Sequence, residues 1–246
     1  GAEEFLQAIL TSPPPHAIIT GYQLREAPKK KFTRFTIKEE KTNASPVRLL
    51  LTPDYALCPD CRKELADKHN RRYHYPFTTC LQCGPRYSVI RSLPYERKNT
   101  SMAPYTMCAA CESEYRDIHH RRHYSQTNSC PHCAIPMHLY DANRQELSAD
   151  PERIVQVLVK ALQEGKIAAV KGTGGYLLLC DATNETAVMT LRNRKHRPQK
   201  PFALLYPSAE AASGDVWLTD EEKDWLVQSD GPILLCRLKA HPASGL

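Results

Sequence analysis

Eight of the ten cysteines fall into four pairs of the form Cys-x-x-Cys. A two-residue gap lets a tight turn present two thiolates to one ion, and four thiolates at about 2.3 Å complete the tetrahedron that zinc prefers. Four thiolates also leave no position open for water or substrate, so we predict two structural zinc sites. The candidate ligands are Cys58, Cys61, Cys80 and Cys83 in one half, and Cys108, Cys111, Cys130 and Cys133 in the other.

Two pairings of the four knuckles are compatible with this spacing, a sequential one and a nested one. Sequential pairing closes two 18-residue loops, and the smaller loops favour it by about 1 kcal/mol in chain entropy. An internal repeat favours it too, because each cysteine recurs 50 residues later. The repeat extends to Tyr55, Glu64, Asp67, Arg71 and Arg72, which match Tyr105, Glu114, Asp117, Arg121 and Arg122. We therefore predict sequential pairing.

The cysteines also indicate the compartment. A disulfide scaffold or a redox Cys-x-x-Cys is the alternative interpretation, but the ligand-like spacing favours free thiolates in a reducing compartment. We expect the cytoplasm. The two remaining cysteines, Cys180 and Cys236, lie in apolar segments, where a thiol is more often a small core residue than a nucleophile.

Histidines and arginines surround the cysteines. The histidines are interpreted as surface residues rather than ligands, with His132, inside a knuckle, the strongest ligand candidate among His69, His74, His119, His120, His123, His132 and His138. Two arginine pairs with neighbouring tyrosines could contact nucleic acid. A solvated loop that packs against a neighbouring domain is the favoured interpretation of Arg71, Arg72, Tyr73 and Tyr75, and of Arg121, Arg122 and Tyr124.

A second candidate site combines a glycine-rich turn with a basic segment. Residues 191–201 bring five cations together at a predicted helix end, where they complement the helix dipole. Backbone amides of Gly172–Gly175, together with Lys171 and these cations, could also hold a phosphate-rich ligand. A tight hairpin explains the glycines equally well.

The elements that would position these sites divide the chain into three parts. Residues 1–45 predict one helix over the first ten residues, ended by prolines, and strands at His16–Leu24 and Phe32–Lys38. So small a part cannot easily bury a core, so we expect the tail of a domain. Residues 46–145 form the duplicated cysteine module.

Residues 146–246 alternate helix and strand. The signals for the helices are Asp150 with Pro151, Asn184, and Thr219 with Glu222. The predicted helices are 151–164, 184–194 and one that starts at Thr219, and the predicted strands are Ile167–Val170, Tyr176–Cys180, Phe202–Tyr206 and Ile233–Arg237, the first two of them buried. The predicted fold class is thus α+β and multidomain, with a small duplicated four-cysteine module followed by a partial α/β domain.

Composition narrows the possible partners. No apolar run approaches the about 18 to 20 residues of a membrane span, and no export signal is visible at the start. The net charge of +6 permits an anionic partner without requiring one. We expect no membrane association.

The motifs resemble one family. The doubled Cys-x-x-Cys module, the segment YPFTTCLQCGPRYSVIRSLPYER and the segment KGTGGYLLLCDATNETAVMTLRNRKHRPQKPFALLY are similar to the HypF carbamoyltransferases of nickel-iron hydrogenase maturation. The resemblance covers about residues 46–206, and the last segment also resembles the YrdC domain. It implies the end of an acylphosphatase domain at 1–45, a tandem zinc-finger module at 46–145, and a YrdC-like domain, incomplete at its C-terminal end, at 146–246.

The resemblance implies an activity. Such an enzyme uses carbamoyl phosphate and ATP with Mg²⁺ to form carbamoyl adenylate, then passes the carbamoyl group to the C-terminal cysteine of HypE as a cyanide-ligand precursor. Lys195 and Arg197 match a basic pair expected at nucleotide phosphates, with Lys200 as a third cation. Thr173 and Tyr176 fall where substrate contacts are expected. No catalytic residue is assigned.

The sequence also departs from the family pattern. The catalytic loop of the acylphosphatase domain, the last segment of the YrdC domain and the ATPase-like domain are not found, so we expect part of a longer protein that does not complete the reaction alone. Two alternatives remain: a threonylcarbamoyl-adenylate synthase, and a zinc-finger module that binds nucleic acid or protein. Nucleic acid is not the expected partner, although the resemblance of the YrdC fold and the arginine and tyrosine pairs point to it.

Overall fold

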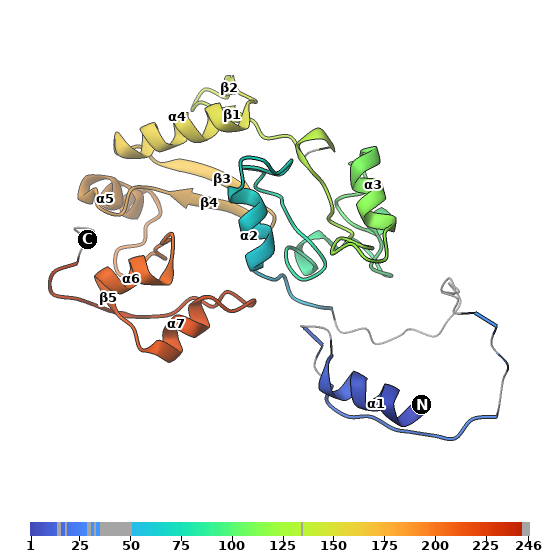
Figure 1. Ribbon diagram of the computed structural model, residues 1–246. Helices are drawn as coiled ribbons and strands as arrows, with labels where there is room; N and C mark the ends of the chain where they lie inside the picture. Colours follow the sequence, from blue (N-terminus) through green and yellow to red (C-terminus); the bar gives the residue numbers. More distant parts are fainter. Residues whose placement is uncertain are drawn as a thin grey trace. The chain divides into compact units, whose positions relative to one another are not determined.

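The computed structural model describes residues 1–13, 16–17, 19–28, 31, 33–34, 51–133 and 135–242. The chain divides into two compact units, Gly1–Leu51 and Thr52–Leu246 (Figure 1). The second unit holds both the cysteine module and the helix-and-strand part that follows it. No helix among these residues is long and apolar enough to cross a membrane.

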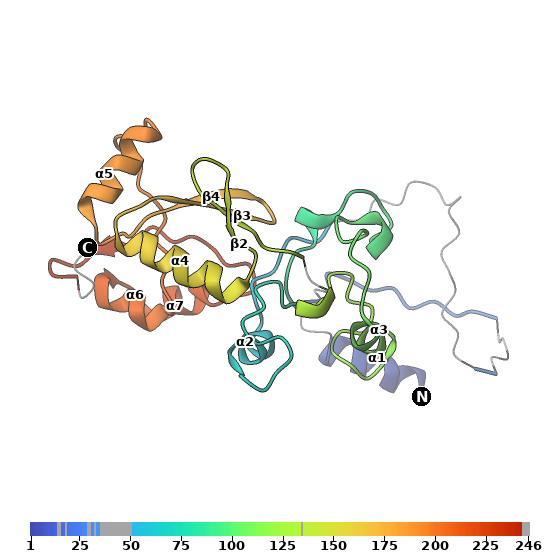
Figure 2. The ribbon, with the colours of Figure 1, turned by 90° about the horizontal axis from the view of Figure 1, so that it is seen from above.

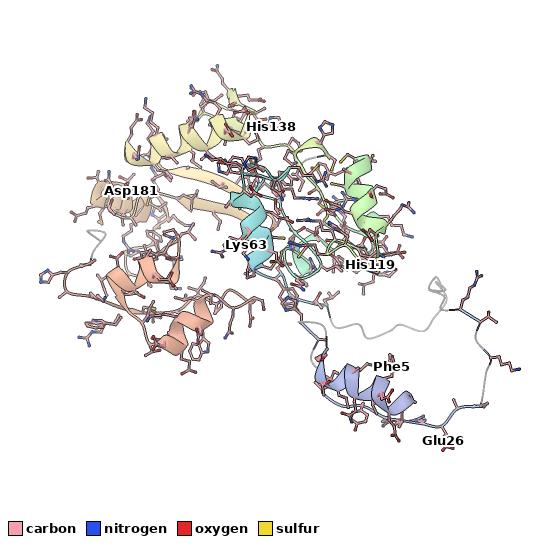
Figure 3. All side chains as sticks on the ribbon, in the orientation of Figure 1. Phe5, Glu26, Lys63, His119, His138 and Asp181 are labelled. Atoms are coloured by element: carbon pink, nitrogen blue, oxygen red, sulfur yellow. The ribbon has the colours of Figure 1, made fainter. Side chains whose placement is uncertain are left out.

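Among its described residues, the first unit contains one helix, α1 (Ala2–Thr11). Glu3 and Glu4 in its first turn complement the helix dipole, while Phe5 stands exposed on it (Figure 3). The predicted strand His16–Leu24 is wrong over its described residues, 16–17 and 19–24, which form no strand. An extended segment becomes a strand only when a neighbouring backbone takes its hydrogen bonds, and no ladder forms here. The predicted strand Phe32–Lys38 lies outside the described residues except for Thr33 and Arg34. The predicted domain boundary at 45 also lies outside them.

The cysteine module consists of short helices and long turns. Its helices are α2 (Pro59–Ala66) and α3 (Ala109–Arg116), with 3-10 turns η1 (Tyr87–Val89), η2 (Arg97–Asn99) and η3 (Pro131–Cys133). The sequence repeat is also a repeat of backbone geometry: Cys58 and Cys108 precede α2 and α3 with φ of −70° and −72°. His74 and Tyr124, 50 residues apart, both have a positive φ, 55° and 54°.

Over its described residues, 135–242, the last part contains four helices and three two-stranded sheets. Its helices are α4 (Pro151–Gln163), α5 (Glu185–Arg194), α6 (Ala209–Asp215) and α7 (Asp220–Leu226). Its strands are β1 (Leu139–Tyr140), β2 (Glu146–Ser148), β3 (Ala168–Gly172), β4 (Gly175–Leu179), β5 (Val216–Trp217) and β6 (Arg237–Leu238). They pair antiparallel as β1 with β2, β3 with β4, and β5 with β6. Figure 2 shows β3 beside β4.

The predicted helix starts are confirmed by their caps. The Asp150 side chain accepts from the Arg153 amide at 2.7 Å, and Asn184 accepts from Ala187 at 3.0 Å. Thr219 forms a full capping box with Glu222. Each cap satisfies amides that the first helical turn leaves unpaired.

The strands show where the sequence prediction fails. β3 and β4 are confirmed, but their predicted burial is wrong, because Tyr176 and Leu177 are 70% and 62% exposed. Phe202–Tyr206 forms no strand, and within Ile233–Arg237 only Arg237 does. Leu205 and Leu235 are accordingly 93% and 90% exposed. Apolar alternation identifies strand-forming segments, but a ladder also needs a neighbour, which these segments lack within the described residues.

Candidate metal centres

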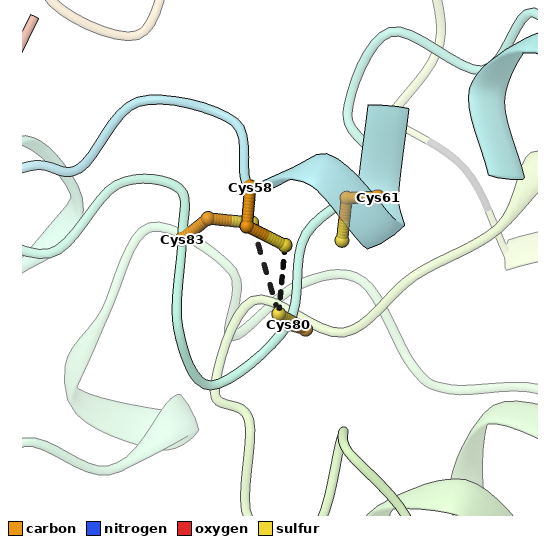
Figure 4. Close-up of side chains that lie close together, drawn as sticks. All are labelled: Cys58, Cys61, Cys80 and Cys83. Atoms are coloured by element: carbon orange, nitrogen blue, oxygen red, sulfur yellow. Dashed lines mark hydrogen bonds between the residues drawn. The ribbon is translucent and has the colours of Figure 1, made fainter. Parts of the chain in front are cut away.

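The eight cysteine sulfurs gather in two groups of four. Within each group all four sulfurs lie within 4.8 Å of one another, and the groups follow the predicted sequential pairing, which is therefore confirmed. Figure 4 shows the first group, where Cys80 Sγ lies 3.7 Å from Cys58 Sγ and 3.8 Å from Cys83 Sγ. In the second group three neighbouring sulfur pairs are separated by 3.7, 3.8 and 3.6 Å.

These separations fit zinc. Four sulfurs at about 2.3 Å from one ion form a tetrahedron with edges of about 3.8 Å, the spacing found in both groups. A disulfide would require about 2.05 Å, and all ten cysteines are free. Both four-cysteine clusters are consistent with structural zinc sites.

Each cluster is built from a helix start and a knuckle. Cys58 precedes α2, and Cys61 lies buried in its first turn. Cys80 and Cys83 come from the knuckle, where the Gln82 amide donates to Cys80 Sγ at 3.3 Å. The turn ends at Gly84, whose φ of +89° suits glycine and whose added Cβ would lie 2.4 Å from the Thr79 methyl.

An arginine from each half reaches the thiolates of the other half. The Arg71 guanidinium donates to Cys111 Sγ at 3.1 Å, and the Arg121 guanidinium donates to Cys61 Sγ. The two contacts are equivalent under the 50-residue repeat. Each arginine donates to a thiolate of the other half, so neither zinc site is surrounded only by its own finger.

The next arginine in each pair is fully buried. Arg72 and Arg122 are 2% and 1% exposed, and their Nε atoms donate to the carbonyls of Ser129 and Thr79, both at 2.9 Å. Arg72 Nη2 also donates to Glu114 at 2.6 Å, and Arg122 donates likewise to Glu64.

The interpretation of these arginines as a solvated or nucleic-acid-binding loop is wrong for Arg72 and Arg122. Tyr75 is also buried, and its hydroxyl donates to Ser129 Oγ at 3.0 Å. A guanidinium is stable there because carbonyls and a carboxylate satisfy its donors. The sequence did contain a signal that these arginines are paired with carboxylates, since glutamates 64 and 114 repeat with the same period as the arginines.

The electrostatics of the second site follow from these contacts. Burial raises the pKa of Glu114, but hydrogen bonds and charges from Arg72 and Arg71 outweigh it and hold the pKa at about 2. Partial burial opposes the charge of Arg71, yet its hydrogen bond to Cys111 raises its pKa above the ordinary value. Both side chains are therefore charged at neutral pH.

Two further arginines support the knuckles and were missed by the sequence reasoning. Arg86 donates to the carbonyls of Cys80, Leu81 and Cys83 at 3.1, 2.8 and 3.1 Å. Arg97 donates to the carbonyls of residues 105, 126 and 128 at 2.6, 2.8 and 2.9 Å. Neither arginine belongs to the 50-residue repeat, since positions 136 and 147 hold Pro and Leu.

The histidines take no part in the clusters. Among the residues that the structure describes, the groups able to hold a metal consist of cysteines alone. His132 is exposed, and His120 Nδ1 accepts from the Arg122 amide at 3.1 Å. Figure 3 shows His119 beyond the end of α3, with its amide bound to Asp117 at 2.9 Å.

The residues predicted to bind nucleotide and substrate lie in two places. Lys171, Thr173 and Tyr176 belong to the β3–β4 hairpin, where Lys171 pairs with Tyr176 and its ammonium lies 5.5 Å from the ring centre. Gly172 pairs with Gly175, so the glycine-rich turn is the tight hairpin that was the alternative interpretation.

The other three, Lys195, Arg197 and Lys200, follow α5. The Arg197 guanidinium donates to the Pro201 carbonyl at 2.8 Å and stands 5.5 Å from the Phe202 ring centre. Lys195 and Lys200 are exposed. Arg197 thus shapes the turn that presents the two lysines, and the binding roles of all six residues stay predictions.

The two cysteines outside the clusters are half-buried. Burial, followed by the nearby Asp181, raises the pKa of the Cys180 thiol. Burial, followed by the nearby Glu222, raises the pKa of the Cys236 thiol. Both thiols are therefore protonated at neutral pH, which suits packing rather than nucleophilic attack.

Comparisons with known proteins agree with the geometry. A family model described as "HypF finger" matches residues 57–90 and 107–140, one match for each cysteine cluster. The Sua5/YciO/YrdC model, described as "Telomere recombination", matches residues 160–244. The chain is 42% identical to carbamoyltransferase HypF of Synechocystis sp. over 96% of its length and 30% of the relative's. The chain belongs to the HypF family.

Further relatives extend this result. Carbamoyltransferase HypF of Rhizobium leguminosarum is 44% identical over 100% of the chain and 30% of its own length. HypF2 of Cupriavidus necator is 46% identical over 84% of the chain and 25% of its own length. The chain therefore spans less than a third of each of these HypF relatives.

Solved HypF structures share the fold. Full-length HypF in its phosphate- and nucleotide-bound form matches with a TM-score of 0.87 at 36% identity, over 98% of this chain and 31% of that one. HypF of T. kodakarensis matches with a TM-score of 0.82 at 38% identity, over 98% and 30%. These matches confirm the predicted fold class: paired four-cysteine fingers followed by a YrdC-like domain.

Proposed function

We propose that this chain supplies the zinc-finger scaffold and the YrdC-like nucleotide-binding region of a carbamoyltransferase that serves [NiFe]-hydrogenase maturation. The observation that carries the proposal is the identity of 42% to 46% with HypF carbamoyltransferases over most of the chain. The TM-score of 0.87 to a nucleotide-bound HypF supports a nucleotide site.

The proposed reaction uses carbamoyl phosphate and ATP. Hydrolysis of carbamoyl phosphate gives carbamate and inorganic phosphate. An oxygen of the carbamate then attacks the α-phosphate of ATP, which forms carbamoyl adenylate and releases pyrophosphate. Phosphoryl and adenylyl transfer depend on cations positioned at the phosphates, a role shared in such sites by Mg²⁺ and basic side chains. Lys195 and Lys200, presented by the Arg197 turn, supply such cations. Lys171, Thr173 and Tyr176 then contact the substrate.

The carbamoyl group is then passed to a protein acceptor, the C-terminal cysteine of HypE, as the precursor of a cyanide ligand. The two zinc ions have no part in the chemistry, since four thiolates complete each coordination sphere. Their role is to hold the fingers beside the YrdC-like region, where the Ala56 amide donates to the Ser229 carbonyl at 2.6 Å. The free thiols suit a reducing compartment, the cytoplasm.

A chimera tests the proposal. This chain replaces the matching region of Synechocystis HypF, and carbamoyl-phosphate-dependent cleavage of ATP to AMP is measured with zinc content as the control for folding. We expect the chimera to be active and Lys195→Ala to lower its rate at least tenfold, about 1.4 kcal/mol of lost charge stabilisation. Lys160→Ala, a lysine 79% exposed on α4, is the matched control and leaves the rate unchanged. A zinc-loaded chimera without activity contradicts the proposal.

The same chimera distinguishes this carbamoyltransferase from a threonylcarbamoyl-adenylate synthase, the alternative suggested by the YrdC-like region over residues 160–244. Cleavage of ATP that depends on threonine and bicarbonate, rather than on carbamoyl phosphate, identifies that activity.

A further inference from the structure

The arginine contacts between the fingers connect the two zinc sites. Arg71 and Arg72 lie in the loop that Cys61 and Cys80 close, yet they bind Cys111 and Glu114 of the other finger. The second finger reciprocates, since Arg121 and Arg122 bind the Cys61 sulfur and the carboxylate of residue 64. Each zinc loop therefore carries the counter-charge of the opposite site.

The negative charge of the sites means that these arginine contacts are stabilising. Four thiolates around one divalent ion leave excess negative charge, and Cys61 and Cys111 are fully buried. A buried anionic cluster is stabilised when charged donors replace the water it has lost. Charge-assisted donors from the opposite finger do this at both sites.

The position of each arginine donor depends on the closure of the zinc loop that carries it, which belongs to the other finger than the thiolates it binds. Zinc-finger loops without hydrophobic cores are ordered by their metal, and the core cluster around the first site consists of its own cysteines with Leu57. The loops also touch directly, through Thr79 Oγ1 and Thr127 Oγ1 at 2.9 Å and through the Leu81 amide and the Arg121 carbonyl at 3.3 Å.

We infer that the two fingers bind zinc cooperatively, because each loaded finger places the arginines that stabilise the thiolates of the other. Ions then enter and leave mainly in pairs. The inference concerns metal loading and is independent of carbamoyl transfer.

Native mass spectrometry of the 246-residue chain, given one zinc ion per chain, tests the inference by counting chains with zero, one and two ions. Equal and independent sites leave about one half of the chains with a single ion, whereas a tenfold coupling lowers that share to about one quarter. We expect one quarter or less. A share near one half overturns the cooperativity.

Paired substitutions test the arginines. Arg71→Met with Arg121→Met removes the shorter arginine–thiolate hydrogen bond at each site, from side chains that are 34% and 27% exposed. We expect the single-ion share to rise towards one half. Arg62→Met with Arg116→Met, on the exposed faces of α2 and α3, is the matched control and keeps the wild-type share. An unchanged share in the first variant overturns the role of the arginines.

A second measurement tests the inference even if the double arginine variant folds poorly. Zinc at the first site is titrated with a competing chelator in a chain that carries Cys108→Ser and Cys111→Ser. We expect at least tenfold weaker retention than in the wild-type chain, and no further loss when Arg121→Met is added, because the loop that carries this arginine is already open. Retention equal to wild type, or a further loss equal to that in the intact chain, overturns the inference.

Discussion

Glu114 is the acceptor on which the crossed arginines of the second site converge, and Glu114→Gln tests its energetic role. Its carboxylate accepts from Arg72 at 3.0 and 2.6 Å, from Arg71 at 2.9 Å and from Asn128 at 3.2 Å. Glutamine keeps the shape and one carbonyl oxygen but turns an amide donor towards the 2% exposed guanidinium of Arg72.

The magnitude follows from the burial. Removing one partner of a buried ion pair costs about 3–5 kcal/mol, because the other charge stays buried and unpaired. Glutamine can still accept one charge-assisted hydrogen bond, worth about 1.5–3 kcal/mol. We therefore expect Glu114→Gln to lower the free energy of unfolding by about 3 kcal/mol, measured by urea unfolding of the zinc-loaded chain.

The control residue, Glu112, lies two residues before Glu114. Glu112→Gln removes an exposed pair with Arg116 on α3, whose side chains are 41% and 77% exposed, so we expect a change of about 0.5 kcal/mol or less. Glu64→Gln, the repeat partner of Glu114, should cost about as much as Glu114→Gln. The reasoning is refuted if Glu114→Gln and Glu112→Gln unfold at the same urea concentration.

Three further predictions concern the knuckle, the YrdC-like region and the metal. Gly84→Ala should lower the free energy of unfolding by about 2 kcal/mol, because its φ is positive and its Cβ would meet Thr79, whereas Gly174→Ala, with nothing within 4 Å, should change it little; thermal unfolding measures both. Burial and the hydrogen bond to Asp215 raise the pKa of Tyr206 to about 12. Its stabilising effect is therefore complete below about pH 10 and lost as the pH rises towards 12, and an alkaline absorbance titration of Tyr206→Phe should lack one phenol that ionises near pH 12. Removing zinc with a chelator should expose the fingers to limited proteolysis while α4 to α7 keep their resistance, and equal cleavage of both regions contradicts a zinc role confined to the fingers.

Local features of the fold could be predicted from the sequence because they depend on neighbouring residues. The cap at Asp150 and the capping box of Thr219 with Glu222 each satisfy amides within one helical turn. The Cys-x-x-Cys spacing also predicts each knuckle, because both of its cysteines lie within four consecutive residues. Whether Phe202–Tyr206 and Ile233–Arg237 form strands could not be predicted this way, since strand pairing depends on segments far away in the chain.

The crossed arginines show what kind of information the sequence lacked. The repeat predicted that Arg72 and Arg122 have equivalent surroundings, and they do. It did not indicate whether each arginine binds its own finger or the other one, because both arrangements preserve a 50-residue period. Only the partner glutamates, 42 residues after Arg72 and 58 before Arg122, reveal the exchange. A duplicated unit whose charged residues are exchanged in this way cannot satisfy either buried guanidinium alone, so the two fingers form a single folding unit.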